Sequence, residues 1–227
     1  MRGLYILVEG QTEEEFVNEV LKDFFLENAI LDVRAIKIQT SPGFKGGAVN
    51  YQRYKSNIKR ILAREEDIIV TSLIDYYKLS SDFPNFKLQD KINGKPEKLD
   101  FLESEIYKDI DNSRFLPYIQ LHEFEGLLFS HQKGFDYIPG ISLKNRELLK
   151  EAVEEHNNPE LLNDGEETAP SKRLKKLIPF YEKTFHGPLI AEEISIQIIK
   201  SKCIRFSFWL DKLIDTFHNS DKQIGKN

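Results

Sequence analysis

Acidic side chains follow three of the apolar runs in this sequence, at the point where each run ends. Glu9 follows the first run, Asp75 the third, and Glu123 and Glu125 lie just after the fourth. If the runs form a parallel sheet, ligands bind outside the carboxyl ends of its strands, where these side chains can converge. Clustered carboxylates repel one another unless a cation bridges them, and oxygen ligands favour Mg²⁺ or Mn²⁺. The pattern predicts a metal site that activates water against a phosphodiester.

Each of these residues also has a structural interpretation. Glu9 can be a solvated carboxylate at a strand end, and Asp75 can be a turn residue. At least one of Glu123 and Glu125 is expected to be a carboxylate at the start of a helix, where it interacts favourably with the helix dipole. We expect His122, which precedes them, to be structural rather than a ligand.

A second group of candidates is basic. Ser171, Lys172 and Arg173 are consecutive, and a Lys or Arg near the metal could stabilise charge on a transferred phosphoryl group. We therefore predict Lys172 as a catalytic residue and Lys172 with Arg173 as nucleic-acid contacts. The alternative is an ordinary basic helix surface, continued by Lys175 and Lys176.

The elements that must position these residues follow from periodicity. Short apolar runs alternate with helical spacing in the first half, which is typical of an α/β domain with a parallel sheet flanked by helices. Strands are predicted at residues 5–8, 33–38, 68–74 and 115–121. Thr12 and Glu15 have the spacing of a capping box for the first helix. After Gly126 the spacing becomes mostly helical.

Two predicted loops are candidates for a functional role. Residues 78–96 form a long polar stretch, and loops of that length inside a compact domain are often functional. Residues 45–47, Lys-Gly-Gly, resemble a phosphate-binding loop only weakly because the P-loop spacing and its Ser/Thr are missing. We interpret them as a flexible loop near the active face.

Composition limits the class of protein. The 227 residues are 40% hydrophobic and 30% charged, as in an ordinary globular protein, and the net charge of −5 argues against a simple nucleic-acid coat protein. Residues 165–227 hold 11 Lys/Arg and 8 Asp/Glu, so the basic charge gathers toward the end. The single cysteine, Cys203, excludes an internal disulfide. The apolar stretch before Glu9 is too short for a signal peptide or membrane span, so we expect a cytoplasmic protein without membrane contact.

Several strings of the sequence resemble a known family. They are VEGQTE at 8–13, LIDYY at 73–77, QLHEFEGLLF at 120–129, PSKRL at 170–174 and CIRF at 203–206 before Trp209. Together they resemble the bacterial domain-of-unknown-function 4276 family over nearly the whole chain. That family is regarded as Toprim-like and similar to the nuclease domains of overcoming-lysogenization-defect proteins, which frequently work beside an ABC-type ATPase in anti-phage defence.

The resemblance implies a fold and roles for particular residues. The change to helical spacing allows a domain boundary near residue 140 or 165. We expect a Toprim-like α/β domain over residues 1–140 and a helical C-terminal extension over 141–220, which could belong to the same domain. Glu9 matches the first-strand glutamate, assigned to metal binding or to general acid and base work. Asp75 matches the first aspartate of the Asp-x-Asp motif. Tyr77 stands at the position of the second aspartate, so a two-metal site would need an oxygen from Glu123, Glu125 or Asp82.

Three hypotheses about function follow. The first is a Mg²⁺- or Mn²⁺-dependent nuclease that hydrolyses DNA or RNA and serves as an effector subunit in anti-phage defence. The second is a non-catalytic adaptor that binds an ABC-type ATPase. The third is another metal-dependent phosphotransfer or nucleotide hydrolysis on the same scaffold.

Overall fold

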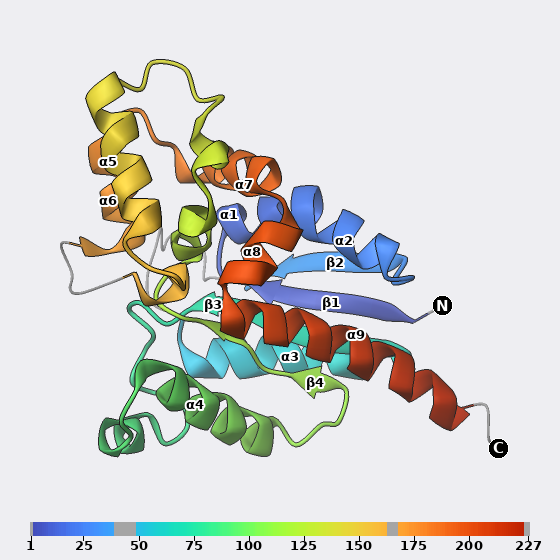
Figure 1. Ribbon diagram of the computed structural model, residues 1–227. Coiled ribbons are helices and arrows are strands. Elements are labelled where there is room, and N and C mark those ends of the chain that lie inside the picture. Colours follow the sequence, from blue (N-terminus) through green and yellow to red (C-terminus); the bar gives the residue numbers. More distant parts are fainter. Residues whose placement is uncertain (1, 39–48, 163–167, 225–227) are drawn as a thin grey trace, which may run out of the picture.

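A computed structural model describes residues 2–38, 49–162 and 168–224 of the chain (Figure 1). The Lys-Gly-Gly sequence at 45–47 lies outside these residues. The strands are β1 (Gly3–Val8), β2 (Asp32–Lys37), β3 (Ile68–Asp75), β4 (Phe115–Leu116) and β5 (Ile119–Gln120). The longer helices are α3 (Tyr51–Arg64), α4 (Lys95–Ile110), α5 (Leu143–Glu154), α6 (Pro170–Leu177), α7 (Lys183–Ile194) and α9 (Ile204–Ile224).

The sheet is parallel throughout its described pairings, as the sequence predicts. Its order is β2-β1-β3-β4, and β5 also pairs with β3. Val8 at the end of β1 is in register with Leu73 near the end of β3 and with Lys37 of β2. The three long strands therefore finish at one edge of the sheet, where the predicted site residues follow them.

The fourth predicted strand, 115–121, is wrong in detail. It is divided into β4 and β5 by Pro117, because proline has no N–H to donate to the ladder. Side chains of β3 restore part of the pairing. Thr71 Oγ1 donates to the Leu116 carbonyl at 2.7 Å, and Ser72 Oγ donates to the Tyr118 carbonyl at 2.9 Å.

Helices cover both faces of the sheet. Alternate side chains of a strand point to opposite faces, and in β1 the residues Leu4 and Ile6 join one hydrophobic cluster while Tyr5 and Leu7 join another. The second cluster also contains side chains of α3 and α4. All six residues of β1 are buried, as expected for a central strand of a parallel sheet.

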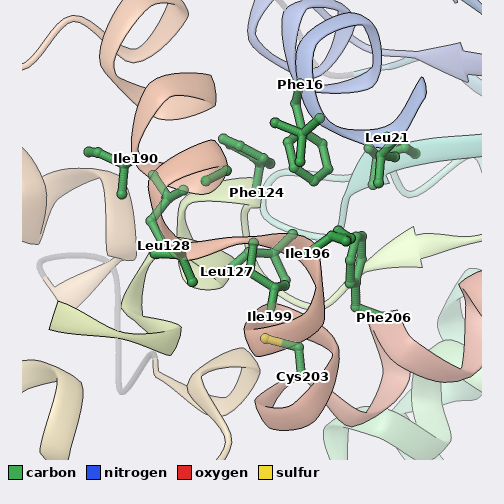
Figure 2. Packing of buried hydrophobic residues seen from close by; sticks show 14 of the residues in the cluster. Phe16, Leu21, Phe124, Leu127, Leu128, Ile190, Ile196, Ile199, Cys203 and Phe206 are labelled. Carbon is green, nitrogen blue, oxygen red and sulfur yellow. The ribbon is translucent and has the colours of Figure 1, made fainter. Parts of the chain in front are cut away.

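The first cluster extends across the predicted boundary at residue 140. On one side are α1 (Gln11–Phe16), the π-helical turn Val17–Leu21, α2 (Lys22–Glu27) and η3 (Phe124–Ser130). On the other are α7, α8 (Ile196–Lys202) and α9. Figure 2 shows Phe16, Phe124, Ile190 and Phe206 in this shared core. The C-terminal part is mostly helical, as predicted.

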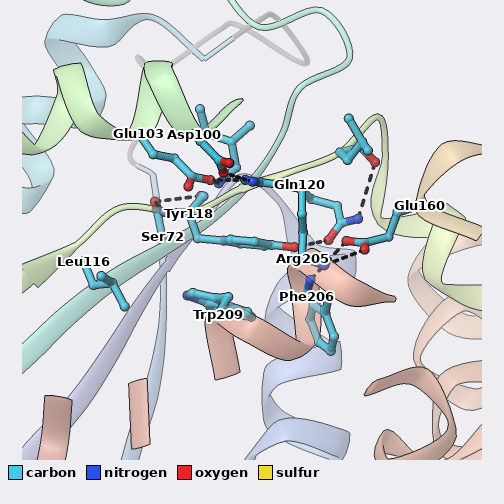
Figure 3. Close-up of polar contacts among 12 residues, drawn as sticks. Ser72, Asp100, Glu103, Leu116, Tyr118, Gln120, Glu160, Arg205, Phe206 and Trp209 are labelled. Atoms are coloured by element: carbon cyan, nitrogen blue, oxygen red, sulfur yellow. Dashed lines mark hydrogen bonds and ion pairs between the residues drawn. The ribbon is translucent and has the colours of Figure 1, made fainter. Parts of the chain in front are cut away.

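Polar contacts fix the start of α9 beside the sheet (Figure 3). The buried Glu160 carboxylate accepts from the main-chain N–H groups of Arg205 at 2.8 Å and Phe206 at 3.1 Å. Such a carboxylate satisfies amides that a helix start leaves without partners. Trp209 Nε1 donates to Thr71 Oγ1 at 2.9 Å. The C-terminal helices are therefore tied to the same strands that carry the candidate site.

The first helix begins two residues earlier than the sequence indicates. Its N-cap is Gly10, and Glu13 occupies the third helical position, so that the Gly10 N–H donates to Glu13 Oε2 at 3.0 Å. The capping box predicted from Thr12 and Glu15 is therefore wrong. In the described part of the chain, none of the helices has the length and apolar character needed to cross a membrane.

Candidate metal centre

Glu9 and Asp75 lie at the ends of adjacent parallel strands. Glu9 directly follows β1 and Asp75 is the last residue of β3, and both are partly buried. Burial and the nearby Glu13 carboxylate raise the pKa of Glu9 to about 7, against the opposing effect of Lys183. Burial, followed by the carboxylates of Glu13 and Glu9, raises the pKa of Asp75 well above its ordinary value. The two predicted strand-end carboxylates therefore interact.

Asp75 also joins β3 to the segment that contains Glu123 and Glu125. Its Oδ1 accepts the main-chain N–H of Phe124 at 2.9 Å. The Tyr77 N–H donates to the His122 carbonyl at 2.8 Å, which extends the connection. This segment is thereby held against the strand end.

Glu123 and Glu125 have different environments. The Glu123 carboxylate accepts from the main-chain N–H and from the hydroxyl of Ser171, each at 3.0 Å, and so caps the start of α6. The Glu125 side chain is fully buried, and neither carboxylate oxygen has a hydrogen-bond partner among the described residues. Lys183 Nζ lies 3.8 Å from Glu125 Oε1. Burial raises the pKa of Glu125 to about 7, although Lys183 opposes the shift.

Glu13 and Lys183 belong to this group but were missed by the sequence analysis. Glu13 is 3% exposed, and its charge acts on Glu9, Asp75 and Glu125. Partial burial lowers the pKa of Lys183, but Glu125 and Glu13 outweigh that effect and raise it above the ordinary value. Glu13 lies four residues after Glu9, in the first turn of α1, a spacing that could have identified it. No local signal marks Lys183, because the packing of α7 on α1 brings it here.

Arg173 of the predicted basic pair is held by an ion pair and a hydrogen bond. Arg173 Nη1 forms an ion pair with Glu155 at 2.7 Å, and Arg173 Nε donates to the Thr168 carbonyl at 3.1 Å. These contacts hold Arg173 within the α5–α6 region. Lys172 is partly buried on α6, next to the Ser171 that binds Glu123.

The remaining candidates are Asp82, Tyr77 and His122. The Asp82 carboxylate accepts the Tyr51 N–H at 3.0 and 3.2 Å and so binds the start of α3. Tyr77, at the second motif position, has a buried hydroxyl without a hydrogen-bond partner in the described chain. His122 adopts the left-handed conformation with φ 66°, and its Nε2 lies 3.4 Å from Lys95 Nζ. Non-glycine residues at positive φ are uncommon and often mark functional sites.

We define the carboxylate cluster as Glu9, Glu13, Asp75 and Glu125, with Lys183 as its facing cation. Four interacting acidic groups, one of them a buried carboxylate without a hydrogen-bond partner among the described residues, provide the hard oxygen donors that Mg²⁺ and Mn²⁺ prefer. Across the described residues, no three His, Cys, Asp or Glu side chains are already arranged to hold a metal ion. The donor chemistry fits a divalent cation, and binding would require these side chains to move closer together.

Comparisons with known proteins agree with this fold. The family model for DUF4276, a domain of unknown function, matches residues 8–214. The C-terminal region of the Burkholderia pseudomallei OLD protein aligns over 96% of this chain and 97% of that chain, with 17% identity and a TM-score of 0.50. The corresponding region of the Xanthomonas campestris pv. campestris OLD protein aligns over 98% and 97%, with 14% identity and a TM-score of 0.47. The comparison with curated proteins gives no match. The predicted α/β fold, Toprim-like with a mostly helical C-terminal part, is confirmed.

Proposed function

We propose that this chain, which belongs to the DUF4276 family of unknown function, hydrolyses phosphodiester bonds in DNA or RNA with Mg²⁺ or Mn²⁺. The observation that carries the proposal is Glu125, whose two buried oxygens have no hydrogen-bond partner among the described residues. A buried carboxylate whose oxygens accept no hydrogen bond from the described residues is costly even with the Lys183 ammonium 3.8 Å away, and a cation bound at the cluster would offset that cost.

The proposed ligands are the four carboxylates of the cluster. Glu9 and Asp75 lie on the sheet edge, while Glu13 and Glu125 face them from α1 and η3. The additional oxygens of Glu13 and Glu125 replace the one expected from the position of Tyr77. Glu123 is assigned a supporting role, because both of its oxygens already bind Ser171.

Lys183 is the second part of the mechanism. Its side chain is 46% exposed, so it lies between the buried cluster and solvent. In the absence of a cation it balances the carboxylates. With a cation bound at the cluster, the Lys183 ammonium would be free to bind a phosphate oxygen and to stabilise the charge that develops there. The cation itself supplies Lewis acidity and activates water.

Lys172 and Arg173 remain candidates for contact with nucleic acid rather than for chemistry. Arg173 already forms an ion pair with Glu155, so a contact of Arg173 with phosphate would compete with that pair. The family resemblance further suggests an effector in anti-phage defence that acts with an ABC-type ATPase, and we include both in the proposal.

A second candidate is the non-catalytic adaptor that binds such an ATPase. One observation favours it: the described residues contain no three-residue group already arranged for a metal. In that case Lys183 would be the permanent counter-charge of the cluster, and added metal would have no effect.

The test is incubation of the purified protein with plasmid, single-stranded DNA, RNA and nucleotides over a panel of divalent metals. It is run with and without an ATPase encoded beside it. Glu9→Ala and Asp75→Ala should each lower cleavage on the order of a thousandfold, because a lost ligand removes several kcal/mol of transition-state stabilisation. Asp82→Ala is the control, since this carboxylate binds α3. Cleavage by the wild type that both site variants retain within about tenfold would place the active site elsewhere.

A further inference from the structure

Tyr181 places a buried hydroxyl beside the carboxylate cluster. The residue lies in the turn before α7 and is 6% exposed, and its hydroxyl has no hydrogen-bond partner in the described chain. Burial first, and then the charges of Glu125, Glu123 and Glu13, raise its pKa well above the ordinary value. A phenol with an ordinary pKa of about 10 is protonated at neutral pH, so this hydroxyl is available as a hydrogen-bond donor.

The side chain of Thr12, on the facing helix, packs near Tyr181. Thr12 on α1 is 1% exposed, and its Oγ1 also has no hydrogen-bond partner among the described residues. A methyl group added at Gly187 of α7 would lie 3.3 Å from Thr12 Cγ2 and 3.5 Å from the Tyr181 hydroxyl oxygen. Both side chains therefore meet at the point where the glycine lets α7 approach α1.

The two hydroxyls and Glu125 are complementary. Both residues carry a buried donor that has no partner in the described chain, and Glu125 of the neighbouring cluster has two buried acceptor oxygens in the same condition. A buried polar group without a partner costs free energy, and Phe or Val would fill the same space without that cost. Hydroxyl groups at positions 12 and 181 are explained if they donate hydrogen bonds to a carboxylate of the cluster in another arrangement of its side chains.

We propose that Tyr181, with Thr12, is a positioning residue that holds the Glu125 carboxylate when it turns to bind a divalent cation. One oxygen of Glu125 would contact the cation, and the other would accept the phenolic hydrogen bond. This inference rests on the proposed metal site. Outer hydrogen bonds of this kind orient ligating carboxylates, and their loss typically weakens metal binding tenfold or more.

The test is calorimetric titration of the full chain with Mn²⁺, together with thermal melts in chelator. Tyr181→Phe removes only the hydroxyl, so its melting temperature in chelator should equal or exceed that of the wild type. Its dissociation constant for Mn²⁺ should rise about tenfold. Thr12→Val should shift both quantities in the same directions. Tyr118→Phe is the matched control, because this buried phenol donates to Gln120 and should leave Mn²⁺ affinity unchanged.

The outcomes separate the two proposals. If the wild type binds Mn²⁺ and Tyr181→Phe binds it equally well, the positioning role is overturned while the metal site stands. If Tyr118→Phe weakens binding as much as Tyr181→Phe, the effect is unspecific and the role is again overturned. If the wild type does not bind Mn²⁺, the proposed function fails, and the role of Tyr181 fails with it.

Discussion

Lys183 Nζ lies 3.8 Å from Glu125 Oε1, and it is the cation that faces four acidic side chains from α1, η3 and the sheet edge. Lys183 is partly exposed whereas Glu125 is fully buried, so the pair differs from an ordinary surface ion pair. Its position suggests that the ammonium and a divalent cation stabilise the same carboxylates. Several measurable consequences follow if the metal ion replaces the ammonium as the positive charge beside these carboxylates.

Lys183→Met should destabilise the metal-free protein by about 1–2 kcal/mol, between the values typical of exposed and of buried pairs. In millimolar Mn²⁺ the loss should shrink, because the metal supplies the missing positive charge. Thermal melts in chelator and in Mn²⁺ measure the loss of stability without and with the metal. Lys200→Met is the control, since Lys200 pairs with Asp211 on the surface. An equal loss for Lys183→Met under the two conditions would mean that lysine and metal do not share a site.

Glu123 and Glu125 should respond differently to the same substitution. Glu123→Gln weakens the contacts to Ser171 and should cost about 1–2 kcal/mol with or without metal, as the loss of a helix cap does. Glu125→Gln removes a buried charge and should stabilise the metal-free protein at pH 8, while it weakens Mn²⁺ binding. Chemical denaturation in chelator and in Mn²⁺ distinguishes them. If the stability cost of Glu123→Gln differs between chelator and Mn²⁺, Glu123 is a ligand of the metal.

The metal-free protein should lose stability as the pH rises from about 5 to 8. Glu9 and Glu125 keep their protons up to a pKa of about 7 in the folded protein, against 4.5 for an ordinary glutamate. The folded state therefore binds more protons than the unfolded chain between these values, and the free energy of unfolding falls through that window. Melting temperatures in chelator across this range should show a shallower fall for Glu125→Gln than for the wild type. Identical slopes would contradict the raised pKa of Glu125.

The sequence predicts the sheet and its acidic edge because the signals are local. The β-branched run that forms β3 is buried along its length, and Asp75 ends it. Glu9 follows β1 in the same way. Parallel strands bring such ends together without further information about packing.

The other parts of the site depend on contacts between distant segments. Lys183 reaches Glu125 only because α7 packs against α1, and the glycine at position 187 that permits this has no local signature. Glu123 and Glu125 are nearly adjacent in sequence, yet Ser171 of α6 donates to Glu123, while the Glu125 oxygens have no hydrogen-bond partner among the described residues. Arg173 is of a residue type that commonly binds phosphate, but in this protein it forms an ion pair with Glu155. Periodicity carries no information about these pairings.

The most direct measurement concerns Asp75→Asn. Asparagine keeps an oxygen that can accept the Phe124 N–H, so the substitution removes charge and preserves the connection to the Glu125 segment. In the wild type, Mn²⁺ at about a hundredfold excess over its dissociation constant should add about 2.7 kcal/mol to stability, a rise in melting temperature of about 5–10 °C. Asp75→Asn should melt higher than the wild type in chelator, because it relieves repulsion within the cluster, and should respond weakly to Mn²⁺. If it melts lower in chelator and gains as much from Mn²⁺ as the wild type does, Asp75 is a structural turn residue and the carboxylate cluster is not a metal site.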